Sequence, residues 1–174
     1  MSKQRGTGDE AASLIDRLAA KGVAVESGAL LSAAATDDLL AISARSQPEV
    51  ERLVAQAYRC LGYQVDSLGG LAAPAEAGML LTKATQRVLL QCKYWKTRKI
   101  TEKPVRELYG VMAAHNANAG ILVTTGSFTL EASRFAGFGR IQLIDGPRLL
   151  AMLRQNGAAQ PAAGPAQRTH TGAR

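Results

Sequence analysis

A glutamine and a lysine two residues apart, Gln91 and Lys93, stand at the end of a short apolar run. The run, residues 88–90, is uninterrupted, which is typical of a central strand covered on both faces. Residues two apart in a strand point to the same face, so this spacing places an amide beside an ammonium group. A protein core rarely tolerates a lysine without a partner. The two residues therefore indicate a site for an anionic ligand at the end of a buried strand.

The chain around these two residues is strongly basic. The 174 residues carry a net charge of +7 and a pI of about 9.8, which is typical of proteins that bind nucleic acids. Seven basic side chains and one carboxylate lie between Arg87 and Arg106, an excess of six positive charges. An aromatic side chain in this segment can stack on a base or a sugar. We expect the nucleic acid to be contacted by Trp95, Lys96, Arg98, Lys99, Lys103 and Arg106.

The pattern of apolar residues predicts a helix followed by three strands and then alternating helices and strands. The first helix carries a continuous apolar stripe, and Pro48 suits its first turn. A tight turn at residues 84–85 joins the second and third strands. The order α-β-β-β-α-β-α-β-α predicts an α/β fold with a mixed sheet flanked by helices. The expected helices cover 48–61, 102–117, 130–135 and 147–154, and the expected strands cover 63–68, 78–83, 86–93, 121–124 and 141–144.

Two segments flank this α/β unit, which we place at residues 47–154. Residues 1–46 contain helical patterns that start near Asp9 and Thr36, each with an apolar stripe that must be covered. This extension is either a cap on the core or an accessory element for a homodimer or a larger complex. Residues 155–174 are rich in Ala, Gly, Pro and Gln, a composition that predicts a disordered tail.

Several separated motifs occur in one order along the chain: Glu49–Val54 with Leu61–Val65, Val88–Lys96, Pro104–Ala113, Gly120–Ala132 and Ile141–Gly146. Together they resemble the Mrr-type restriction endonuclease domain of the PD-(D/E)xK nuclease superfamily. The resemblance covers residues 48–153, and several ordered motifs are far more specific than a lone Gln-x-Lys. It implies a restriction-endonuclease-like fold that binds double-stranded DNA.

The resemblance also implies a chemistry, the hydrolysis of phosphodiesters with a divalent metal ion such as Mg²⁺. It implies catalytic roles for Glu51 on the first core helix and for Gln91 and Lys93 on the third strand. In an active site of this kind, the lysine positions the attacking water or steadies the phosphate.

The metal-binding aspartate that the family carries on its second strand is missing. Leu80 takes its place, or Met79 if the hairpin is spaced differently, and residues 77–92 contain no Asp or Glu. The metal ligands are therefore unknown, with Asp66 and Glu76 as candidate substitutes near the strand ends. Two interpretations follow: a DNA endonuclease with a migrated carboxylate, or an inactive relative that acts as a DNA-binding or assembly module.

The remaining sequence features point to a reducing compartment. The two cysteines, Cys60 and Cys92, fall on a predicted helix and a predicted strand, which indicates free thiols rather than a disulfide framework. No apolar run approaches the ~20 residues that a membrane span needs, and the N-terminus has no secretory pattern. We therefore expect a cytoplasmic protein without membrane contact.

Overall fold

The computed structural model describes residues 33–68, 78–93 and 99–156. The helix expected from Asp9 and the tail from residue 157 onward lie outside these ranges. No helix within them is long and apolar enough to cross a membrane. The elements are α2 (Ala33–Ser43), α3 (Gln47–Cys60), β1 (Gln64–Ser67), β2 (Met79–Lys83), β3 (Gln86–Cys92), β4 (Lys99–Ile100), α4 (Glu102–Ala114), β5 (Ala119–Val123), β6 (Ser127–Phe128), α5 (Leu130–Phe138), β7 (Ile141–Ile144) and α6 (Gly146–Gln155).

The main sheet has five strands in the order β1-β2-β3-β5-β7. The pairs β1–β2 and β2–β3 are antiparallel, and the pairs β3–β5 and β5–β7 are parallel. The predicted mixed sheet flanked by helices is thus confirmed. β4 and β6 form a separate two-stranded parallel sheet that the sequence pattern did not predict, because two-residue strands show no alternation.

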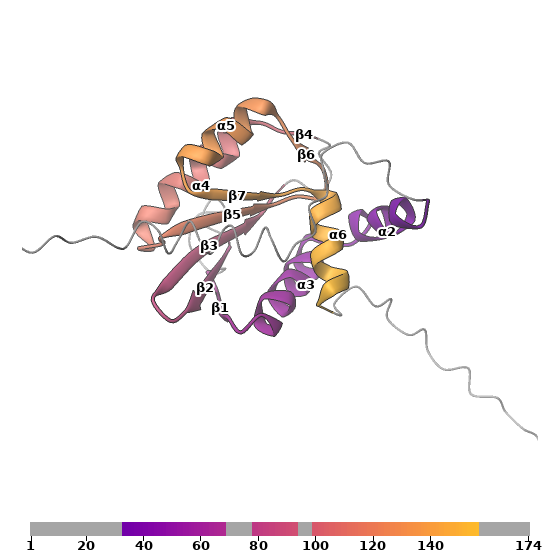
Figure 1. Ribbon diagram of the computed structural model, residues 1–174, viewed down its shortest axis with the longest axis horizontal. Helices are drawn as coiled ribbons and strands as arrows, with labels where there is room; N and C mark the ends of the chain where they lie inside the picture. Colours follow the sequence, from indigo (N-terminus) through magenta and orange to yellow (C-terminus); the bar gives the residue numbers. More distant parts are fainter. Residues whose placement is uncertain (1–32, 69–77, 94–98, 157–174) are drawn as a thin grey trace, which may run out of the picture.

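Helices cover both faces of the main sheet (Figure 1). Val88 and Leu90 of β3 belong to a core cluster that includes residues of α2, α3 and α6. Leu89 belongs to a second cluster, which includes Leu108 of α4 and residues of α5. Successive side chains of β3 therefore pack into two different core clusters, as expected for a strand that is buried on both faces.

The helix boundaries follow from local backbone chemistry. At the start of α3, the Ser46 N–H donates to Glu49 Oε2 at 2.8 Å, and the hydrogen bonds from Ser46 lower the pKa of the Glu49 carboxyl. α4 ends at Ala114 rather than at the expected residue 117, because Asn116 adopts a left-handed conformation with φ of 51°. α6 begins at Gly146, where Asp145 caps it by accepting from the Arg148 N–H at 3.1 Å.

The described part of the N-terminal segment packs on the core. α2 is already helical at Ala33, the first described residue, and Ile42 is buried in the same cluster as residues of α6. Asp38 pairs with Arg154 of α6, while Leu40 stays 64% exposed. The core therefore covers part of the apolar stripe of α2 and leaves another part exposed. The division of the chain at residue 46 stays a prediction.

The two cysteines differ sharply in exposure, which gives a direct test of the fold. Cys60 is exposed on α3, whereas Cys92 is buried, and burial raises the pKa of its thiol well above the usual value. Because the thiolate is the reactive form, we expect one fast-reacting thiol in the folded protein at pH 8 and two in denaturant. Titration with a chromogenic disulfide reagent counts them, and Cys60→Ser removes the fast one. Two fast thiols in the folded protein would contradict the buried position of Cys92.

Candidate functional site

Gln91 and Lys93 lie on one face of β3 at its carboxyl end. The Gln91 side chain is fully buried, and the Lys93 side chain is 15% exposed. The Lys93 N–H donates to the Val123 carbonyl at 3.0 Å, so the ladder to β5 continues through this residue. Both side chains point toward α4, on the face that Leu89 shares. The structure therefore brings the two together as the spacing predicted.

The ammonium group of Lys93 is paired with a carboxylate from α4. Lys93 Nζ lies 3.1 Å from Glu107 Oε2, and the Glu107 side chain is 32% exposed. Glu107 directly precedes Leu108, which is fully buried against the sheet, so the helix backbone holds the carboxylate at the end of β3. Sequence reasoning missed this partner, because its role depends on how α4 packs.

The residue that faces Gln91 across the β2–β3 hairpin is a glycine. Met79 pairs with Leu90, which puts Gly78 opposite Gln91. A Cβ atom at Gly78 would lie 3.1 Å from Gln91 Cγ and only 2.6 Å from the Leu90 carbonyl oxygen. The backbone of the two strands thus leaves no room for a side chain here. A signal was present in the sequence, since the predicted tight turn at residues 84–85 already pairs position 78 with position 91.

Leu80 lies two pairs farther along the hairpin than Gly78. It pairs with Leu89 of β3 and with Asp66 of β1, so these three residues form one row across the sheet. That Leu80 stands where the family carries aspartate stays a prediction, but neither Leu80 nor Met79 is the residue opposite Gln91. Asp66 is exposed on the edge strand, and its carboxylate accepts from Gln64 Nε2 at 3.1 Å. Glu76 lies outside the described residues.

Glu51, the third predicted catalytic residue, belongs to α3. Its Oε1 accepts from Gln47 Nε2 at 3.0 Å. Burial is the main cause that raises the pKa of the Cys92 thiol, and the negative charge of Glu51 is the second cause. Cys92 packs in the cluster on the α3 side of the sheet, whereas its neighbours Gln91 and Lys93 point to the α4 side. The contacts of Glu51 therefore lie on the α3 side of β3, whereas the Lys93 ammonium lies on the α4 side.

The predicted nucleic-acid contacts divide into three groups. Trp95, Lys96 and Arg98 lie outside the described residues. Arg106 already has two partners within the protein. It forms an ion pair with Glu102, and its guanidinium stacks 4.3 Å from the centre of the Phe135 ring. Lys99 and Lys103 are exposed, and neither forms an ion pair with a described residue. The exposed charge in this region therefore rests on β4 and on the first turn of α4.

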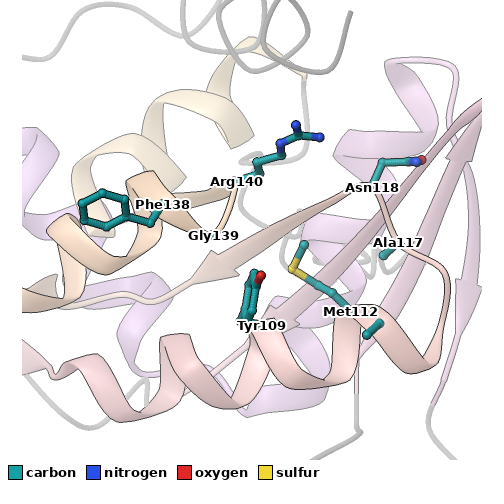
Figure 2. A pocket seen from close by; sticks show the side chains of 8 residues that line it. Tyr109, Met112, Ala117, Asn118, Phe138, Gly139 and Arg140 are labelled. Carbon is teal, nitrogen blue, oxygen red and sulfur yellow. The ribbon is translucent and has the colours of Figure 1, made fainter. Parts of the chain in front are cut away.

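A pocket of about 440 Å³ lies at the opposite end of α4. Figure 2 shows Tyr109 rising from α4 toward Arg140, with Met112 beside it. Asn118 and Arg140 precede β5 and β7, so the pocket lies where the parallel strands begin, whereas Lys93 lies where β3 ends. This pocket is therefore not part of the site around Lys93.

The site thus lies in an α/β domain with a mixed sheet, and a lysine stands at the end of the central strand β3. The family model described as restriction endonuclease, that of the Mrr catalytic domain, matches residues 42–153, well over half of the chain. The chain therefore belongs to this restriction endonuclease family. None of the curated proteins matches it significantly.

Several solved structures are similar to this chain at low identity. A protein of unknown function, AF1548, is 17% identical with a TM-score of 0.53, over 63% of this chain and 67% of its own. The MspJI restriction endonuclease, solved with a 27-mer oligonucleotide, is 20% identical with a TM-score of 0.45, over 90% of this chain and 34% of its own. The DNA modification-dependent restriction endonuclease AspBHI is 13% identical with a TM-score of 0.48, over 92% and 40%. This chain thus spans about a third of MspJI and two fifths of AspBHI.

Domains of the PD-(D/E)xK type generally use divalent metal ions. Such ions require carboxylate and other oxygen ligands. In the described parts of the chain, no three His, Cys, Asp or Glu side chains lie close enough to hold a metal. Gly78 offers no ligand opposite the neutral Gln91, and Glu107 is paired with Lys93. The described residues of this site therefore do not fit a metal ion.

The close approach of the two strands at Gly78 can be tested by comparing two glycines. Gly78→Ala forces a Cβ against the Leu90 carbonyl and should destabilise the protein by about 1–3 kcal/mol, as overpacking does. The control is Gly110→Ala on α4, where a Cβ meets nothing within 4 Å. Alanine should stabilise that helix by about 0.5–1 kcal/mol. Urea unfolding measures both, and a Gly78→Ala variant as stable as the parent would show that the strands have room for a side chain.

Proposed function

We propose that this chain binds double-stranded DNA through the surface formed by β4 and the first turn of α4. The observation that carries the proposal is the exposure of Lys99 and Lys103, neither of which forms an ion pair with a described residue, on a restriction endonuclease fold. Exposed cations of this kind attract the phosphate backbone and release its counterions.

The proposed binding is tolerant of sequence. Lysines contact phosphates as point charges, and phosphate contacts carry no base information. Trp95, Lys96 and Arg98 belong to the same stretch of chain and are proposed as further contacts. Arg106 is expected to contribute less to DNA binding, because the Glu102 carboxylate offsets its charge and its guanidinium stacks on the Phe135 ring.

The first test is the salt dependence of binding to a duplex of arbitrary sequence. Replacing Lys99 and Lys103 together by alanine should reduce the slope of log K against log salt by about two units, one for each lost phosphate contact. The matched control replaces Arg52 and Arg59 of α3, two exposed cations on the helix that packs against the other face of the sheet. Fluorescence anisotropy from 50 to 200 mM salt measures both. Equal slopes for the two double variants, or salt-independent binding by the parent, would refute the proposed surface.

We further propose that cleavage by this chain is weak or absent, so that it serves as a DNA-binding or assembly module. The supporting observations are the glycine opposite Gln91 and the engagement of Lys93 by Glu107. The second candidate is a Mg²⁺-dependent endonuclease whose missing carboxylate comes from Asp66 or Glu76. Membership of the restriction endonuclease family favours this second candidate.

Plasmid nicking with Mg²⁺ or Mn²⁺ separates the two candidates. The parent chain should leave supercoiled plasmid intact, because no described carboxylate stands opposite Gln91. Lys93→Ala is the control for contamination, since an activity that survives this change does not come from the site. Robust nicking by the parent that Lys93→Ala abolishes would establish the endonuclease, and Asp66→Asn and Glu76→Gln would then identify the ligand.

A further inference from the structure

Lys93 and Glu107 are held against each other by two separate parts of the core. The backbone of Lys93 is fixed by its hydrogen bond to Val123 in the β3–β5 ladder. The backbone of Glu107 is fixed by Leu108, which is fully buried in the cluster that contains Leu89 and Leu122. The two backbones are therefore fixed by the core, and pairing costs only side-chain freedom.

The ion pair is also partly shielded from water. The Lys93 side chain is 15% exposed and the Glu107 side chain 32% exposed, so their attraction is screened less than that of fully exposed charges. A lysine in this position is costly to leave without a counter-charge. Among the described residues, the carboxylate that pairs with Lys93 comes from α4.

The same carboxylate stands beside the proposed DNA-binding surface. Lys103 lies four residues before Glu107 on α4, and residues four apart share one face of a helix. A phosphate that approaches Lys103 therefore meets a negative charge one turn farther along the helix, in front of Lys93. Glu107 occupies the position that a phosphate needs for contact with Lys93, and it repels that phosphate.

We infer that Glu107 is an internal competitor for DNA phosphate at Lys93 and so determines which lysines bind DNA. The inference rests on the proposed DNA binding and refines it: Lys99 and Lys103 contact phosphate, and Lys93 becomes available only when the charge of Glu107 is removed.

The test is a double-mutant cycle on the salt slope of duplex DNA binding. Glu107→Gln keeps the shape of the side chain and removes its charge. With Lys93 present, this change should steepen the slope by about one unit, which is about a fourfold greater loss of affinity between 50 and 200 mM salt. In a Lys93→Met background, the same change should leave the slope of that background unaltered. The double variant removes both charges and so leaves no unpaired ion if Glu107→Gln alone folds poorly.

Each outcome of the cycle decides the inference. An equal effect of Glu107→Gln in both backgrounds would mean that the carboxylate repels DNA at long range without blocking Lys93. No change, or weaker binding, with Lys93 present would mean that the ion pair only supports the structure. Either result would overturn the inference while leaving DNA binding intact. The failure of the proposed function is a different result, namely a parent chain that shows no salt-dependent binding at all.

Discussion

The parallel pairing of β3 with β5 is the constraint on which the site depends. Parallel strands cannot be joined by a short turn, so the chain must cross over the sheet between them, and here it does so through α4. The crossover buries Leu108 in the cluster that holds Leu89 and Leu122. It thereby sets Glu107 at the end of β3, within 3.1 Å of the Lys93 ammonium. The pairing of two buried strands thus determines the electrostatics of a polar site.

The order of the main elements could be read from the sequence because most of them bury a regular apolar face. β5 is buried along its whole length, and α3 and α4 carry continuous stripes. The predictions were inaccurate where a boundary depends on one residue, as at Asn116, whose positive φ follows the end of α4. They missed β4 and β6, which exist because Lys99–Ile100 and Ser127–Phe128 meet in space rather than because either has a pattern of its own.

The site could be predicted only as far as local geometry reaches. A spacing of two within one strand was sufficient to bring Gln91 and Lys93 together. The length of the turn is sufficient to place Gly78 opposite Gln91. The contact with Glu107 was beyond such reasoning, because periodicity gives the buried face of α4 but not the strand end against which the helix lies. Pairings between distant elements require the packed structure.

The effective charge of the site differs from the charge counted along the chain for the same reason. The sequence shows an excess of six positive charges between Arg87 and Arg106. The fold offsets Lys93 with Glu107 and Arg106 with Glu102, and of these two carboxylates only Glu102 lies in the counted segment. The attraction that a phosphate meets depends on the cations that remain exposed, such as Lys99 and Lys103. The proposed DNA binding therefore depends on exposed cations, whereas metal-dependent hydrolysis depends on carboxylates, so the two draw on different groups of one fold.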